Sequence, residues 1–322
     1  MTSEMDRRAF LGTSALIGAG LLTGNRASGA EFKTTLKKAL IGKPTEDTLK
    51  SWKAAGFDGI ESNDRAVSLA DAAAARVRAE KIGMDIQSML WGWANFNDAD
   101  PAKVKACLAE IEHSLNACRE YGATALLLVP CRVGGMDMPL PWEFDIEFDE
   151  ETLMVSKVAS GDNSKYQAYI DAQNHATKAS IEAVKSLIDV AEQTGVVIAL
   201  ENVWNNLWVK PKFFKAFIAS FDSPWVQAYY DIGNHVRYAD PVEWIETLGK
   251  LICRIHVKDF KLDRSKGAGG DFVDIRNGSV DWPAVRKALD DVGYNGWMTI
   301  EGSGGLSLEQ QSEYLDLIIA GK

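Results

Sequence analysis

The chain alternates short apolar runs with amphipathic stretches, and this period constrains its fold more than any other feature of the sequence. Eight runs have the composition of buried strands. They span residues 36–42, 57–62, 84–90, 123–130, 196–202, 226–232, 252–258 and 297–302. Strand-like runs that alternate with helical patterns are typical of βαβ units and a parallel sheet.

Several of the intervening helical stretches close on a glycine just before the next run, as a helix C-cap does. Gly56, Gly122, Gly195 and Gly293 are examples. Eight βα units in about 290 residues are what a TIM barrel requires. A doubly wound open sheet is the alternative, but no G-x-G-x-x-G follows the first run, which disfavours a dinucleotide-binding fold. We therefore predict a single-domain (β/α)8 TIM barrel over residues 31–322.

The first thirty residues form a segment of a different kind. Arg7 and Arg8 precede a mild apolar run, Ala9–Leu22, which is too short and too rich in small polar residues to span a membrane. We predict that residues 1–30 are a signal peptide and that the mature form has no membrane span, with an uncleaved anchor as the alternative. The paired arginines resemble a twin-arginine signal, which implies export of the folded protein to the periplasm of a bacterium.

Charge and cysteine content exclude some classes of function. The formal net charge of -10 gives no basic footprint for nucleic acid. The four cysteines lack C-x-x-C spacing, so we expect them to pack rather than to bind metal. Residues 131–170 form a long insertion after the fourth run, on the face where barrel enzymes carry active-site loops. Its acidic stretch is compatible with a lid, a partner surface or a solvated loop.

Potential metal ligands stand at the ends of the last four runs. They are Glu201, Asp231, His256 and Glu301. The carboxyl ends of barrel strands point to a common mouth, where three carboxylates would repel one another unless a cation neutralised them. Such an oxygen-rich set with one nitrogen suits Mn²⁺ above all, with Mg²⁺, Co²⁺ or Zn²⁺ as alternatives.

Five stretches, "IALEN", "YYDIGN", "RIHVKDF", "GSVDWPAVRKAL" and "GYNGWMTIEG", resemble the xylose isomerase-like TIM barrel superfamily in its sugar phosphate isomerase/epimerase branch. The resemblance implies that the four strand-end residues hold the metal and that Glu201 and Glu301 also transfer protons from opposite faces of a sugar. It also implies a homo-oligomer, since such barrels often form dimers or tetramers. Epimerases with a D-x-x-H motif carry histidine where this chain has Asn234, which speaks against a ketohexose 3-epimerase.

Seven further residues are predicted to contact the substrate. Tryptophans after the third and fifth runs are candidates to stack on a sugar, although loop tryptophans often only cover a barrel. A lysine two residues after His256 shares its side of the strand, with a salt bridge as the alternative role. The seven are Glu61, Trp91, Trp93, Trp204, Asn234, His235 and Lys258.

The predicted function is proton transfer on a sugar or keto-sugar through an enediolate. No glycine-rich phosphate cradle or arginine cluster is evident at the predicted mouth, so we expect an unphosphorylated substrate. Elimination or hydration of 3-keto-glycosides through the same intermediate is one alternative, and a non-catalytic sugar-binding barrel is another. An endonuclease of the same superfamily would need a basic groove and more than the four histidines present.

Overall fold

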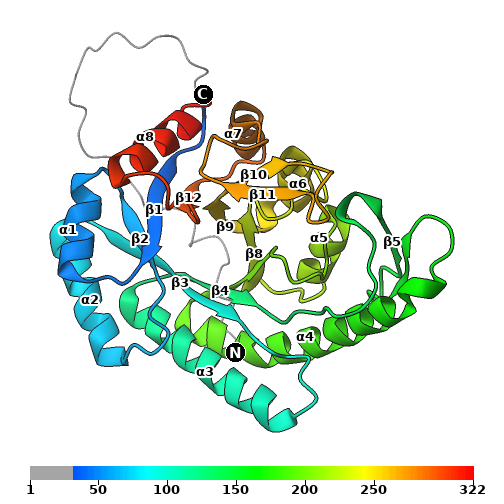
Figure 1. Ribbon diagram of the computed structural model, residues 1–322. Helices are drawn as coiled ribbons and strands as arrows, with labels where there is room; N and C mark the ends of the chain where they lie inside the picture. The colour runs from blue at the N-terminus through cyan, green and yellow to red at the C-terminus, as the bar shows by residue number, and fades with distance from the viewer. Residues whose placement is uncertain (1–31) are drawn as a thin grey trace, which may run out of the picture. The chain divides into compact units, whose positions relative to one another are not determined.

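The computed structural model describes residues 32–322, and its centre is a closed barrel of eight parallel strands (Figure 1). Around the barrel the strands follow the order β1, β2, β3, β4, β7, β8, β9 and β12. Their bounds are β1 Leu36–Gly42, β2 Gly59–Ser62, β3 Asp85–Trp93, β4 Ala125–Val129, β7 Val197–Glu201, β8 Val226–Asp231, β9 Ile252–Val257 and β12 Gly296–Ile300. The predicted TIM barrel is confirmed. The predicted signal peptide lies outside the described residues.

Helices surround the barrel (Figure 1). They are α1 Glu46–Ala54, α2 Leu69–Ile82, α3 Pro101–Tyr121, α4 Gln167–Thr194, α5 Pro211–Ala219, α6 Pro241–Leu248, α7 Trp282–Asp291 and α8 Leu308–Ile319. Gly122 and Gly195 end α3 and α4 in the left-handed conformation, which is the C-cap role predicted for them. None of the helices in the described part of the chain is long and apolar enough to cross a membrane.

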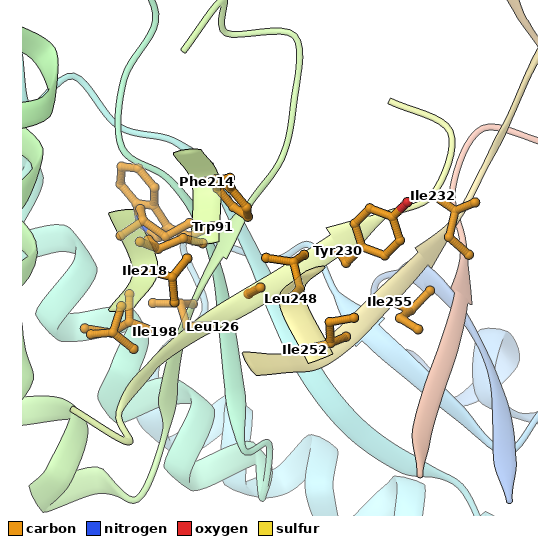
Figure 2. Packing of buried hydrophobic residues seen from close by; sticks show 14 of the residues in the cluster. Trp91, Leu126, Ile198, Phe214, Ile218, Tyr230, Ile232, Leu248, Ile252 and Ile255 are labelled. Carbon is orange, nitrogen blue, oxygen red and sulfur yellow. The ribbon is translucent and has the colours of Figure 1, made fainter. Parts of the chain in front are cut away.

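The alternating faces of each strand divide the core into two layers. In β4, Leu127 points into the barrel, where it packs in a small cluster with Ala199 and Tyr229. Leu126 points outward and belongs to the larger cluster between strands and helices. Figure 2 shows Leu126 in this outer layer near Ile218 of α5. Because both faces of the strand are buried, β4 is apolar throughout.

The predicted insertion at residues 131–170 contains a small antiparallel sheet. Its strands are β5 Phe144–Phe148 and β6 Val155–Ala159. Lys157 of β6 lies 2.9 Å from an oxygen of Asp145 and 2.7 Å from an oxygen of Glu147. Part of the acidic stretch is therefore paired across this hairpin at the protein surface.

Two features of the mouth differ from the prediction. The strand β3 continues to Trp93, so Trp91 and Trp93 belong to the strand and do not follow it. A second hairpin follows β9 directly and was not predicted. It consists of β10 Asp259–Leu262 and β11 Gly270–Val273.

Candidate metal centre

The four predicted metal ligands meet at the carboxyl ends of their strands. Glu201 ends β7, Asp231 ends β8, His256 lies in β9 and Glu301 follows β12. One potential ligand atom from each lies within 4.8 Å of the others. His256 Nδ1 is 3.0 Å from Glu201 Oε1, 3.5 Å from Glu301 Oε2 and 3.9 Å from Asp231 Oδ2. The imidazole edge that carries Nδ1 therefore faces all three carboxylates.

Local hydrogen bonds hold Asp231 in place. Its backbone N–H donates to Asn202 Oδ1 at 2.7 Å, and its Oδ1 accepts from the backbone N–H of Asn234 at 2.7 Å. Between these residues, Gly233 packs against the end of β9. A Cβ at Gly233 would lie 2.7 Å from the carbonyl oxygen of Lys258, so glycine is needed for this close approach.

Glu201, Asp231, His256 and Glu301 form the group that we call the ring, and the first three of them are buried. Burial raises the pKa of Glu201 and raises that of Asp231 well above its usual value. Burial also opposes the charged form of His256, but Tyr229 and the surrounding carboxylates raise its pKa well above the ordinary value. For Glu301 the effect of burial is outweighed by the contacts with His256 and a lysine, which lower its pKa. Three carboxylates thus converge on one position, where a positive charge would reduce their mutual repulsion.

A divalent cation fits this arrangement. Among residues 32–322, Asp231 Oδ2 is buried and has no hydrogen-bond partner. A buried carboxylate oxygen without a partner is costly, and a cation at the ring would supply one. Three carboxylates and one imidazole are also a donor set that Mn²⁺, Mg²⁺ or Co²⁺ accepts.

Lys258 completes the polar part of the mouth. Its Nζ donates to Glu301 Oε2 at 2.9 Å and lies 4.7 Å from the ring centroid of Phe272 in β11. Phe272 is 39% exposed and presents an aromatic surface beside the ring. Phe272 was not predicted, because no feature of the sequence places the β10–β11 hairpin at the mouth.

The three tryptophans predicted to contact the substrate differ in how exposed they are. Trp91 is only 3% exposed, and the guanidinium of Arg65 lies 4.0 Å from its ring centroid. Trp204 is covered by Arg237 at 3.6 Å. The guanidinium of Arg132 lies 4.2 Å from the ring centroid of Trp93, which remains 38% exposed. A guanidinium group thus lies over each of the three rings, and Trp93 is the most exposed of them.

Asn234 and His235 are engaged by the loops around them. Asn234 Nδ2 donates to the carbonyl oxygen of Asn202 at 3.1 Å. His235 Nε2 lies 2.9 Å from the carbonyl oxygen of Val203, and the ring packs against Trp244. Burial lowers the pKa of His235 to about 3, so this ring is neutral. Both side chains, which were predicted to contact the substrate, are buried in these contacts.

Glu61 lies on the other side of His256 from the carboxylate ring. It is wholly buried, and its Oε2 is 3.4 Å from His256 Nε2. Tyr229, inside the barrel, donates a hydrogen bond to the same oxygen. Glu61, predicted to contact the substrate, thus contacts His256, one of the four predicted metal ligands. Tyr229 was not predicted, although its position two residues before Asp231 puts both on one face of β8.

A cleft of about 550 Å³ opens beside Glu301 at the ends of β1, β2, β3 and β12. Its walls are mainly apolar, and no residue that lines it is Lys, Arg or His. They include Leu40, Trp52, Leu90, Asn63, Ser303 and Gln311. The cleft can accept a neutral molecule that reaches the ring at one end.

The profile of the xylose isomerase-like TIM barrel family matches residues 49–317. The putative L-ribulose-5-phosphate 3-epimerase SgbU of Haemophilus influenzae is 29% identical over 140 residues, which are 42% of this chain and 49% of that protein. The chain spans about half the length of the curated relatives it matches.

Two solved structures have the same fold. The apo 3-keto-D-glucoside 4-epimerase YcjR from E. coli superposes with a TM-score of 0.63 at 17% identity, over 88% of this chain and 99% of that chain. A xylose isomerase-like TIM barrel protein from Mycobacterium smegmatis in complex with magnesium gives a TM-score of 0.60 at 21% identity, over 86% and 87%. At these identities the likeness establishes the fold.

Proposed function

Since the chain belongs to the xylose isomerase-like TIM barrel family, we propose that it is a divalent-metal-dependent sugar isomerase or epimerase. The observation that carries the proposal is the ring of Glu201, Asp231, His256 and Glu301, in which the first three residues are buried. The names of two similar proteins support it, because one is a putative pentulose-phosphate epimerase and the other a keto-glucoside epimerase. The structure with magnesium supports a divalent cation, and we propose Mn²⁺.

The chemistry follows from the positions of the two glutamates. A cation in the ring would act as a Lewis acid that makes the C–H beside a substrate carbonyl more acidic. Glu201 and Glu301 come from β7 and β12, with β8 and β9 between them, so they can reach a substrate from two sides. One glutamate, ionised, removes the proton, and the other, protonated, donates its own proton to the opposite face of the enediolate, which inverts the carbon. Return of the proton to the adjacent carbon gives isomerisation.

We propose an unphosphorylated sugar or keto-sugar as substrate. The cleft beside Glu301 has no basic lining residue to hold a phosphate, and Lys258 is paired with Glu301. The exposed face of Phe272 can instead cover the apolar face of a sugar ring. Lys258 can donate a second hydrogen bond to a substrate oxygen while it holds Glu301.

Proton exchange in D₂O tests this proposal. The protein is loaded with Mn²⁺ and incubated with free ketoses, 3-keto-glycosides and the matching ketose phosphates, and the metal is chelated before each NMR spectrum. We expect metal-dependent loss of the C–H signal beside the carbonyl for an unphosphorylated sugar. Loss of a β-substituent would identify the lyase alternative. Exchange confined to the phosphates would contradict the proposed substrate class, and sugar binding without any exchange would leave a non-catalytic barrel.

We also propose that residues 1–30 direct export through the twin-arginine route to the periplasm of a bacterium. Support comes from Arg7 and Arg8 ahead of the apolar run. Replacement of both arginines by lysine in the full chain should retain the protein in the cytoplasmic fraction at its full size. Equal amounts of shortened periplasmic protein from the variant and the wild type would contradict this route.

A further inference from the structure

A chain of buried polar side chains runs through the barrel interior below the ring. At its upper end, Glu61 Oε2 is 3.4 Å from His256 Nε2 and accepts from Ser88 Oγ at 2.8 Å and from the Tyr229 hydroxyl. Its other oxygen, Oε1, is buried without a partner in the described part of the chain, so all of these contacts fall on Oε2. Polar groups in a barrel core need a reason, because apolar residues usually fill that space.

The chain continues downward from Tyr229. The Tyr229 hydroxyl lies 3.5 Å from Thr299 Oγ1, which accepts from Gln87 Nε2 at 3.1 Å. Gln87 Oε1 in turn accepts from Arg254 Nε at 2.6 Å. Glu61, Tyr229, Gln87 and Thr299 are all buried. The chain thus joins the metal ring to an arginine near the start of β9.

The two ends of the chain fix the direction of every hydrogen bond. The Arg254 guanidinium can only donate, and a Glu61 carboxylate can only accept. Tyr229 has a single hydroxyl proton and uses it on Glu61, so the Thr299 hydroxyl donates to Tyr229. All the protons along the chain therefore point toward Glu61.

This direction determines the state of His256. Opposite a carboxylate that only accepts, Nε2 must carry a proton. In the neutral ring Nδ1 then has the free lone pair, and it faces Glu201, Asp231 and Glu301. An imidazole that donates its other N–H to a carboxylate is held in one tautomer and one orientation for metal binding.

We propose that Glu61 and Tyr229 are positioning residues that fix the tautomer and orientation of His256 for the cation. The inference rests on the proposed metal-dependent function and goes beyond it, because it assigns a role to two residues that touch neither metal nor substrate.

Mn²⁺ binding to the variants Glu61→Gln, Tyr229→Phe and Tyr230→Phe tests the proposal, with the dissociation constant measured by electron paramagnetic resonance. Tyr230→Phe is the matched control, because Tyr230 is equally buried on the same strand but faces the outer layer and bonds to Pro241 (Figure 2). We expect Glu61→Gln to weaken binding about 10- to 100-fold and Tyr229→Phe about 10-fold, with Tyr230→Phe unchanged. Equal affinities in all three would overturn the proposal.

Wild-type binding separates this inference from the proposed function. If the wild type binds neither Mn²⁺ nor Zn²⁺, the metal centre itself is wrong and both proposals fall. If Tyr229→Phe does not fold, Thr299→Val interrupts the same chain one step further from His256 and should weaken Mn²⁺ binding to a smaller degree.

A second measurement needs no change in the chain. In the Zn²⁺-loaded wild type, a long-range ¹H–¹⁵N spectrum should show the His256 proton on Nε2, with the signal assigned by its absence in His256→Asn. A proton on Nδ1 would overturn the proposal.

Discussion

Two wholly buried aspartates, Asp231 at the metal ring and Asp259 at the start of β10, are treated in opposite ways by the fold. Asp259 accepts from the indole of Trp282 and from four backbone N–H groups, at distances of 2.8 to 3.3 Å. Asp231 accepts at Oδ1 from Asn234, whereas its Oδ2 has no donor among the described residues. The first aspartate is satisfied by the chain alone, and the second keeps a free oxygen where we propose that the cation binds.

The surroundings of Asp259 are built for that purpose. A Cβ at Gly278 would lie 2.0 Å from Asp259 Oδ1, so only glycine lets this loop close on the carboxylate. Burial raises the pKa of Asp259, although its hydrogen bonds favour the charged form. Burial alone therefore does not mark a functional carboxylate. An uncompensated oxygen at a point where other carboxylates converge does.

The largest expected effect is the loss of proton exchange when a carboxylate of the ring is replaced. Glu201→Gln keeps the shape of the side chain but removes its ability to accept a proton, so the exchange rate on the substrate should fall about 10²- to 10⁴-fold. The rate is measured by NMR in D₂O at saturating Mn²⁺. Glu313→Gln, an exposed change of the same type in α8, is the control. Exchange at the wild-type rate in Glu201→Gln would remove this residue from the proposed mechanism.

On the structural side, Asp259→Asn should lower the free energy of unfolding by about 1–3 kcal/mol, because the lost hydrogen bonds outweigh the removal of a buried charge. An amide in place of the carboxylate brings two donors toward the N–H groups that now donate to Asp259. Urea unfolding measures the change. The control Asp263→Asn, at a partly exposed turn after β10, should stay within about 0.5 kcal/mol of the wild type. Similar losses in both variants would mean that the hydrogen bonds to Asp259 carry no special weight.

Asp231→Asn should have the opposite sign in the metal-free protein. Burial raises the pKa of Asp231, so its charged form destabilises the folded state. This destabilisation is absent at low pH, where the carboxyl group is protonated, and it grows as the pH rises. Removal of the charge should therefore stabilise the chelated protein at neutral pH by roughly 1–2 kcal/mol. Thermal unfolding in a chelator measures this, and added Mn²⁺ should stabilise the wild type but not the variant. A lower melting temperature in the chelated variant would show that Asp231 is structural, like Asp259.

The smallest effect concerns the edge of the mouth. Phe272→Ala should raise the KM for the sugar about 3- to 10-fold, because an aromatic contact contributes about 0.5–1.5 kcal/mol. Its 39% exposure predicts little change in stability. Leu262→Ala, on the same hairpin and 46% exposed, is the matched control for KM. Equal KM values in the two variants would remove Phe272 from the substrate site.

The sequence alone determined the barrel and the meeting of the four ring residues. Each strand is a local apolar run, and eight such runs close in one way, with their carboxyl ends at a common mouth. A residue at the carboxyl end of a run is therefore predicted to lie at the mouth of the barrel. Glu201, Asp231, His256 and Glu301 all occupy such positions, and the structure brings them together.

The tertiary structure decided what surrounds the ring. Tyr229 and Glu61 are 168 residues apart in the chain, so their contact depends on the closure of the barrel. The guanidiniums over Trp91 and Trp204, and the hairpin that carries Phe272, depend on packing between loops. The apolar period of a strand determines which end and which face of the strand a residue occupies. The contacts of its side chain depend on segments distant in sequence, which only the folded chain brings together.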